Sequence, residues 1–261
     1  MSNHVVTDFW RGLTRSTPAR IALGRAGPGM PTEQVLAFSL AHAQARDAVH
    51  TPFDAKAMAD AAQSLGFDTR IVTSAAPDRA TYLRRPDYGR RLSADSRAAL
   101  EAENLGPVDL AIVVADGLSS AAIHAQASPF LAALKPWIVD SSWSTGPVVI
   151  AGQARVALGD EIGELMQARA VLVLIGERPG LSSPDSLGLY LTYQPKIGRN
   201  DGERNCISNV RAAGLAHDLA AFKLVWLLRE ALTRGLTGVQ LKDESDLLLV
   251  EGRPPVPKIE G

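Results

Sequence analysis

The sequence predicts an α/β protein with a doubly wound, mostly parallel sheet that is flanked by helices and preceded by a helical N-terminal region. Two observations predict this fold class. From residue 67 onward, short apolar runs alternate with segments of helical spacing, a pattern typical of such sheets. Before residue 67, helical spacing prevails. We therefore expect a helical region at 1–66, an α/β domain at 67–240 and a C-terminal tail at 241–261.

Two helices are expected in the N-terminal region. The first begins around Thr32, which is a plausible N-cap, and runs to about Val49. The second begins at Asp54 and stops at Gly66, because glycine readily takes the left-handed conformation that ends a helix. The glycine-rich stretch at 24–29, which precedes both helices, follows no clear strand, so a turn is favoured over a phosphate-binding loop.

The α/β domain is expected to contain short apolar strands and amphipathic helices in alternation. The β-branched content and length of the strand segments favour burial in a parallel sheet. The expected strands cover residues 67–73, 108–115, 147–150, 170–175, 189–193 and 206–210. The expected helices cover residues 119–135, 158–168 and 218–234, and the last one ends at Gly235.

The tail differs in composition from the domain before it. A polar stretch at 241–246 is followed by the apolar residues 247–250 and then by a proline-rich segment at 253–257. A terminus that lies on the surface or is disordered is the favoured interpretation. The alternative is a short apolar segment that docks on a neighbour.

Composition excludes several classes of protein. The net charge of −1 lacks the basic excess that nucleic-acid-binding domains show. Cys206 is the single cysteine, which excludes an internal disulfide and fits a reducing compartment. No apolar run approaches the roughly 18 residues of a membrane span, and the N-terminus has no signal-peptide pattern. We expect a cytoplasmic protein that binds neither nucleic acid nor a membrane.

The segment 176–188 is the candidate site. It follows the apolar run 170–175, and ligands of open α/β sheets lie at the carboxyl ends of their strands. It carries two acids, one arginine, three serines and two prolines. A stand-alone α/β hydrolase or nucleotide-binding protein that uses this loop is one interpretation. Against it, the sequence lacks a nucleophile elbow, a dinucleotide fingerprint and a P-loop.

The remaining chemically active residues carry weaker signals. Cys206 is more typical of a buried small hydrophobe than of a nucleophile. His42 and His50 share a helix face with Arg46, but no acid or cysteine stands at ligand spacing, so a solvated face is favoured over a metal site. The arginine pairs at 84–85 and 90–91 fit either a grip on a phosphate or carboxylate, or ordinary ion pairs. We therefore assign no metal ligand.

Five strings in the same order carry a family resemblance. They are RIALGRAG (20–27), YLRRPDYGRR (82–91), ADGLS (115–119), GERPGL (176–181) and NCISN (205–209). Together they resemble the small (light) subunit of adenosylcobalamin-dependent ethanolamine ammonia-lyase, over roughly residues 8–240. The resemblance implies a hetero-oligomer of large–small subunit pairs that is active only when both subunits are present.

In that family, the large subunit is a barrel that holds ethanolamine and most catalytic groups. The small subunit contributes to the adenosylcobalamin site at the interface between the two, and ethanolamine is converted to acetaldehyde and ammonia by a radical mechanism. The cofactor carries the radical chemistry, while the protein supplies binding, orientation and electrostatics. The resemblance thus implies that the 67–240 domain binds cobalamin and that this chain supplies no catalytic residue.

The resemblance also implies three cofactor-binding residues, Val156, Glu177 and Cys206. Glu177 would accept a hydrogen bond from an amide side chain of the corrin ring, or else form an ion pair with Arg178 or cap a helix. Val156 would make an apolar or backbone contact, or else be a core valine. Cys206 would line the pocket. The sequence lacks Asp-x-His-x-x-Gly, which fits base-on binding of the cofactor.

Two departures from the family bear on these expectations. Better-known relatives carry a longer N-terminal extension that directs the enzyme to a bacterial microcompartment, whereas the recognisable core here begins near Asp8. The location is therefore left open between the cytoplasm and a microcompartment. The tail exceeds the usual end of the family. A purely structural partner subunit, which braces the large subunit without touching cobalamin, also remains as an interpretation.

Overall fold

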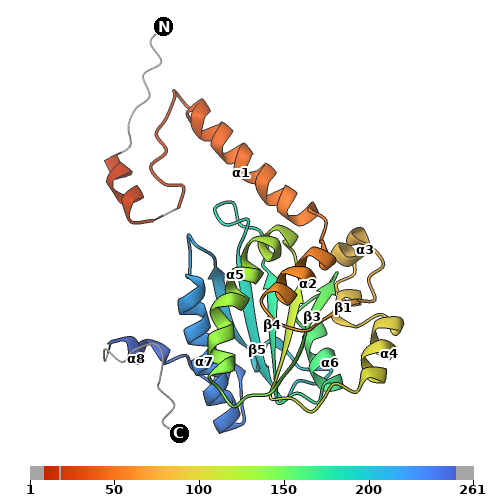
Figure 1. The fold of residues 1–261 in the computed structure, drawn as a ribbon. Helices are drawn as coiled ribbons and strands as arrows, with labels where there is room; N and C mark the ends of the chain where they lie inside the picture. Colours follow the sequence, from red (N-terminus) through yellow and green to blue (C-terminus); the bar gives the residue numbers. More distant parts are fainter. Residues whose placement is uncertain (1–8, 18, 251–261) are drawn as a thin grey trace.

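A six-stranded sheet forms the centre of the computed structural model, which describes residues 9–17 and 19–250 (Figure 1). The strand order is β1-β3-β2-β4-β5-β6; the first four strands are parallel, and β5 and β6 are antiparallel to their neighbours. This confirms the mostly parallel sheet. The strands are β1 (Thr69–Thr73), β2 (Leu110–Ala115), β3 (Thr145–Gly152), β4 (Ala170–Gly176), β5 (Leu187–Tyr193) and β6 (Asn205–Val210).

Helices cover both faces of the sheet, as expected for a doubly wound fold (Figure 1). The α-helices are α1 (Thr32–His50), α2 (Ala55–Ser64), α3 (Arg79–Arg84), α4 (Ala94–Glu103), α5 (Ser120–Val139), α6 (Leu158–Leu165), α7 (His217–Arg234) and α8 (Ser245–Val250). Four short 3₁₀ helices join them among the described residues: η1 (Phe9–Arg15), η2 (Tyr88–Arg90), η3 (Asp201–Glu203) and η4 (Gly238–Gln240).

The central strands are buried on both faces, which explains their continuous apolar runs. Alternate residues of β2 join two separate cores: Ile112 and Val114 pack with α2, α5 and α7, whereas Val113 and Ala115 pack with α4 and α6. All four side chains are fully excluded from solvent. The sheet is therefore a rigid base for the loops at its carboxyl edge.

Helix boundaries follow from capping. Asp54 caps α2 by accepting a hydrogen bond from the Ala57 N–H, as predicted. The prediction of Thr32 as the N-cap of α1 is wrong, because the Pro31 carbonyl accepts the first helical hydrogen bonds and Thr32 is already helical. Helix α7 ends at Gly235, whose left-handed φ of 71° matches the predicted terminator.

Helices α3 and α4 were not expected from the sequence. Helix α3 buries only Tyr82 and α4 buries only Leu100, so neither shows the apolar stripe of a core helix. N-capping side chains stabilise them instead: Asp78 accepts a hydrogen bond from the Thr81 N–H, and Ser93 accepts one from the Ser96 N–H. Between them, these helices connect β1 to β2.

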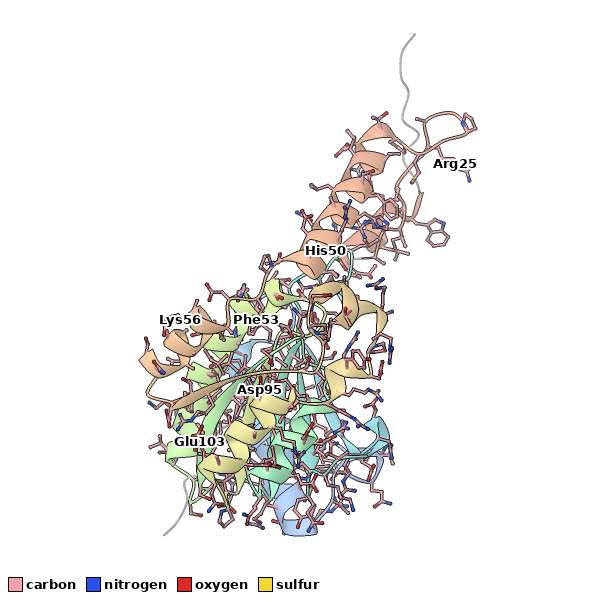
Figure 2. The ribbon with its side chains drawn as sticks, turned by 90° about the vertical axis from the view of Figure 1, so that its right-hand side faces the viewer. Arg25, His50, Phe53, Lys56, Asp95 and Glu103 are labelled. Atoms are coloured by element: carbon pink, nitrogen blue, oxygen red, sulfur yellow. The ribbon has the colours of Figure 1, made fainter. Side chains whose placement is uncertain are left out.

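Helix α1 projects away from the sheet, whereas α2 packs beside α5 and β1 (Figure 1). Only Ala41 and Ala48 of α1 are buried. Figure 2 shows α1, which we call the arm, from another side. His50 lies at its base, where the chain joins the body, and Arg25 lies in the segment that precedes the helix. Within the described residues, no helix has both the length and the apolar character needed to cross a membrane.

The first part of the tail lies on the surface of the body. Leu241 and Ser245 are buried, and Lys223 of α7 forms ion pairs with Asp243 and Asp246 at 3.3 and 2.7 Å. These contacts favour the surface-laid interpretation for this part. The proline-rich segment at 253–257 lies outside the described residues.

Candidate functional site

A pocket of about 600 Å³ lies at the carboxyl edge of β4, and we call it the carboxyl-edge pocket. Segments that follow β2, β3 and β4 line it together with β5, so it stands where open α/β sheets bind ligands. Two of the three residues implied by the family resemblance, Val156 and Glu177, are in its wall. Its wall also includes Tyr82, Arg155, Arg178 and Tyr190.

Glu177 follows β4, and its carboxylate connects three segments. It accepts hydrogen bonds from the hydroxyls of Ser186 and Ser208 and, at 3.2 Å, from the Asn209 backbone N–H. Neither an ion pair with Arg178 nor a helix cap forms within the described part of the chain. A carboxylate offers about four acceptor positions, so these three bonds leave room for one more donor.

Val156 lies in the short segment between β3 and α6. It is half-buried and packs against the core that contains Leu158 and Ile162 of α6. A side chain in this position is not an ordinary, fully enclosed core valine. It presents an apolar surface to the carboxyl-edge pocket beside Arg155.

Cys206 was expected to be buried, and this is wrong: the residue is exposed. It lies on the edge strand β6, opposite Tyr190 of β5. Cys206 does not line the carboxyl-edge pocket itself, but its neighbour Tyr190 does. Desolvation by the surrounding protein, with a contribution from the Glu177 carboxylate, raises the pKa of the Cys206 thiol, which disfavours a nucleophilic thiolate.

Tyr82 is a buried residue of the pocket's wall. The guanidinium carbons of Arg79 and Arg155 lie 4.8 and 4.3 Å from its ring centroid, and its hydroxyl donates to the Ala154 carbonyl at 3.1 Å. Burial raises the pKa of the Tyr82 phenol, so it stays protonated. A Cβ at Gly89 would lie 2.9 Å from both Tyr82 and Arg155, which explains the glycine in this string.

Asp116 follows β2 and is fully buried. Its carboxylate accepts from the Ala154 N–H at 2.9 Å and from Arg79 at 3.3 Å, and burial raises its pKa to about 6. Arg79 also donates to the carbonyls of Gly117 and Val49, at 2.8 and 2.9 Å. The pair therefore links the carboxyl edge of the sheet to the end of α1.

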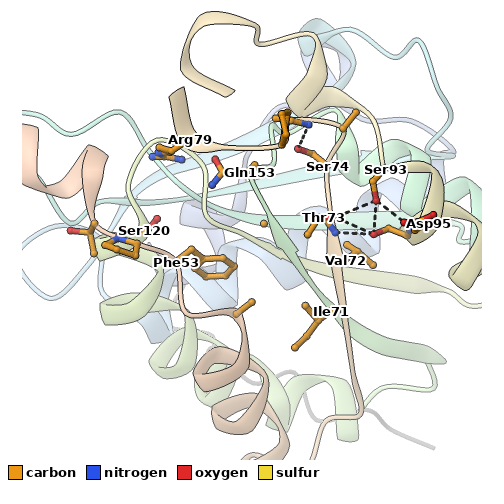
Figure 3. A pocket seen from close by; sticks show the side chains of 18 of the residues that line it. Phe53, Ile71, Val72, Thr73, Ser74, Arg79, Ser93, Asp95, Ser120 and Gln153 are labelled. Carbon is orange, nitrogen blue, oxygen red and sulfur yellow. Dashed lines mark hydrogen bonds between the residues drawn. The ribbon is translucent and has the colours of Figure 1, made fainter. Parts of the chain in front are cut away.

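A second cavity, of about 810 Å³, lies beside the edge strand β1 (Figure 3). The Ser96 hydroxyl accepts from the Thr73 N–H at 3.0 Å and so satisfies part of the open edge of β1. Figure 3 shows Arg79 and Gln153 together on one side of this cavity and Thr73 and Ser93, whose hydroxyls are hydrogen-bonded, on the other. None of the three residues implied by the family resemblance lines it.

Sequence reasoning missed Tyr82, Arg155 and Tyr190. Tyr82 stands in one of the five strings, and Arg155 directly precedes Val156, so the signal for both was present. Tyr190 could be found only from the strand order, which places β5 beside β4. Among the described residues, no group of three or more histidine, cysteine, aspartate or glutamate side chains is placed to hold a metal ion.

Comparison with known proteins identifies the family. The model of the ethanolamine ammonia-lyase light chain matches residues 7–242. An ethanolamine ammonia-lyase small subunit of Pseudomonas fluorescens is 53% identical over 249 residues, which cover 94% of this chain and 90% of the relative. Small subunits of Xanthomonas campestris and Azotobacter vinelandii are 56% and 54% identical, over 92% and 93% of this chain and 89% and 91% of the relatives. The chain belongs to the ethanolamine ammonia-lyase light-chain family.

Proposed function

We propose that this chain is the small subunit of an ethanolamine ammonia-lyase and that its carboxyl-edge pocket forms part of the adenosylcobalamin site at the interface with the large subunit. The enzyme would convert ethanolamine, held mainly by the large subunit, to acetaldehyde and ammonia by a radical mechanism. The family match over most of the chain supports the lyase assignment. The observation that carries the cofactor assignment is that Val156 and Glu177, 21 residues apart, line one pocket.

The residues present fit the cofactor. Cobalamin has an apolar ring, neutral carboxamide side chains and a nucleotide loop, and the pocket offers an apolar surface at Val156, an acceptor at Glu177 and donors at Arg155 and Arg178. The Arg155 Nε atom is buried without a hydrogen-bond partner among the described residues, so a donor is available. A corrin cofactor is larger than a 600 Å³ pocket, so a second chain would have to cover the rest.

The work of this chain would be binding and orientation. When bound, adenosylcobalamin supplies the radical chemistry. Val156 would make an apolar contact, and Glu177 would use its remaining acceptor position for a carboxamide N–H, held in place by Ser186 and Ser208. Cys206, beside Tyr190, would line the rim. We expect large–small pairs to assemble into a hetero-oligomer, in the cytoplasm or in a microcompartment.

The alternative of a stand-alone hydrolase finds no favouring observation. The wall of the carboxyl-edge pocket contains no histidine. The Ser186 hydroxyl donates to Glu177 as part of the structural connection, and Ser183 forms a tight turn with Gly180. Among the described residues, no serine of this loop is hydrogen-bonded to a histidine, the base that most often activates a serine nucleophile.

Two measurements test the proposal. Acetaldehyde release from ethanolamine with adenosylcobalamin should appear only when the large subunit and this chain are combined. Replacement Glu177→Ala should weaken cobalamin binding by the assembled complex about tenfold, the typical value of a hydrogen bond to a charged group. Glu244→Ala, at an exposed carboxylate in the tail, is the matched control and should change nothing. Cobalamin affinity unchanged by Glu177→Ala would instead support the purely structural partner.

A further inference from the structure

Two arginines of the carboxyl-edge pocket lack an acidic partner. Within the described residues, neither Arg155 nor Arg178 forms an ion pair, although both line the pocket. Their neighbours differ: Arg79 pairs with Asp116 at 3.3 Å, and the buried Arg204 pairs with both oxygens of Asp160 at 2.5 and 2.7 Å. Unpaired guanidinium groups in a pocket favour an oxyanion, such as a carboxylate or a phosphate, that can accept two parallel N–H hydrogen bonds.

Arg155 is held in one orientation. Its backbone N–H donates to the Gly89 carbonyl at 2.7 Å, and its guanidinium stacks on the buried Tyr82 ring, with a 3.4 Å contact to the Tyr82 carbonyl. The Nε atom is nonetheless buried and has no partner among the described residues. A buried donor without a partner costs free energy, so a bound ligand that accepts a hydrogen bond from this Nε atom would stabilise the complex.

The acids of the pocket do not compete for these arginines. The Glu177 carboxylate already accepts three hydrogen bonds, and Asp201 pairs with Arg204 at 3.3 Å. Helix α6 begins next to Val156, and no side chain caps its N-terminus. The first turn of α6 carries the acids Asp160 and Glu161, but these pair with Arg204 and Arg97 and not with Arg155.

We propose that Arg155 and Arg178 bind the phosphodiester of the nucleotide loop of cobalamin. This inference rests on the proposed function. The phosphodiester is the anionic group of the cobalamin periphery, because the side chains of the corrin ring are neutral carboxamides. The nucleotide loop would then enter the carboxyl-edge pocket, and the larger ring would face the large subunit. Glu177, in the same pocket, remains the acceptor for a carboxamide.

The test compares two probes on the assembled large–small complex: cyanocobalamin, and dicyanocobinamide, which lacks the nucleotide loop and its phosphodiester. Equilibrium binding is followed by visible absorbance after separation from free ligand. Arg155→Met should weaken cyanocobalamin binding about 10- to 100-fold and leave dicyanocobinamide binding unchanged. Arg155→Lys keeps the charge but loses the paired N–H donors of the guanidinium, so it should give an intermediate loss of cyanocobalamin binding.

Arg178 is exposed, so Arg178→Met should fold normally and should weaken cyanocobalamin binding severalfold, again without an effect on dicyanocobinamide. Arg84→Met is the matched control, because Arg84 is an exposed arginine of α3 that donates to the Ala80 carbonyl of its own helix and does not line the carboxyl-edge pocket. It should bind both probes as the unmodified complex does. If Arg155→Met fails to fold, Arg155→Lys and Arg178→Met decide the question.

Three results would overturn the inference. Equal losses for both probes, or no loss for either, would mean that the arginines do not contact the phosphodiester. Weaker association with the large subunit, with the preference for cyanocobalamin unchanged, would mean that they pair with a carboxylate of that subunit. Failure of the proposed function gives a different result: the unmodified complex would bind no more cyanocobalamin than the large subunit alone.

Discussion

Helices α1 and α7 are nearly equal in length, with 19 and 18 residues, yet they bury their side chains very differently. Eight residues of α7 are buried, against two of α1. The apolar residues of α1 instead face outward: Leu36 is 65% exposed and Leu40 is 59% exposed. Helices of similar length thus form a core element in one region and an exposed arm in the other. The helices of this chain therefore cover its sheet, whereas the apolar side chains of α1 stay exposed among the described residues.

The largest expected effect separates the two helices by stability. Leu224→Ala in α7 removes a side chain that is 1% exposed and should lower the free energy of unfolding by about 2–5 kcal/mol. Leu36→Ala in α1 should change it by less than about 0.5 kcal/mol, because no buried contact is lost. Urea unfolding of the purified chain measures both values. Equal losses would show that α1 is part of the core.

The next prediction concerns the point where the arm meets the body. Burial raises the pKa of Asp116 to about 6, above its ordinary value of 3.8, so the folded state holds this proton more tightly than the unfolded state. The stabilisation that protonated Asp116 adds to the free energy of unfolding is therefore fully present below pH 3.8 and is lost as the pH rises through about 6. The shift corresponds to about 3 kcal/mol.

Other carboxyl groups titrate in the same range, so the measurement is a comparison with Asp116→Asn. Relative to this variant, the unmodified chain should lose stability between pH 4 and pH 6.5. Parallel pH profiles for the two proteins would show that Asp116 has an ordinary pKa. The Arg79 link from Asp116 to the Val49 carbonyl would then contribute no pH dependence at the base of α1.

The smallest expected effect addresses what covers the arm. The paired replacement Leu36→Glu and Leu40→Glu should weaken association with the large subunit about tenfold, or about 1.4 kcal/mol in total, because only a minority of interface residues contribute more than about 1 kcal/mol each. Leu247→Glu in α8 is the matched control, because Leu247 is also a leucine, with 60% exposure. Sedimentation of mixtures with the large subunit gives the affinities. An equal loss with Leu247→Glu would extend the interface to the tail, and no loss with the α1 pair would leave the arm outside it.

Strands buried on both faces were the easiest elements to predict. In β2 and β4, every residue is buried, so the apolar run marks the strand directly. Helices α3 and α4 escaped prediction because one buried residue each leaves no periodic signal. The exposure of Cys206 was mispredicted because β6 is an edge strand, and the sequence does not reveal strand order.

The candidate site was predictable in part for the same reason. Glu177 follows an obvious strand, and the rule that ligands bind at carboxyl edges was sufficient to single out its loop. Arg155 lies in the segment after β3, and Tyr190 lies in β5. The two residues line one pocket because the strands lie in the order β3, β2, β4 and β5. That order is long-range information, which local patterns do not contain.

The most direct test of the central claim is an electron cryomicroscopy structure of the assembled large–small complex with bound cobalamin. The proposal predicts cobalamin in contact with Val156 and Glu177, with part of it inside the carboxyl-edge pocket. A structure in which the large subunit alone surrounds cobalamin, while this pocket faces solvent, would contradict it.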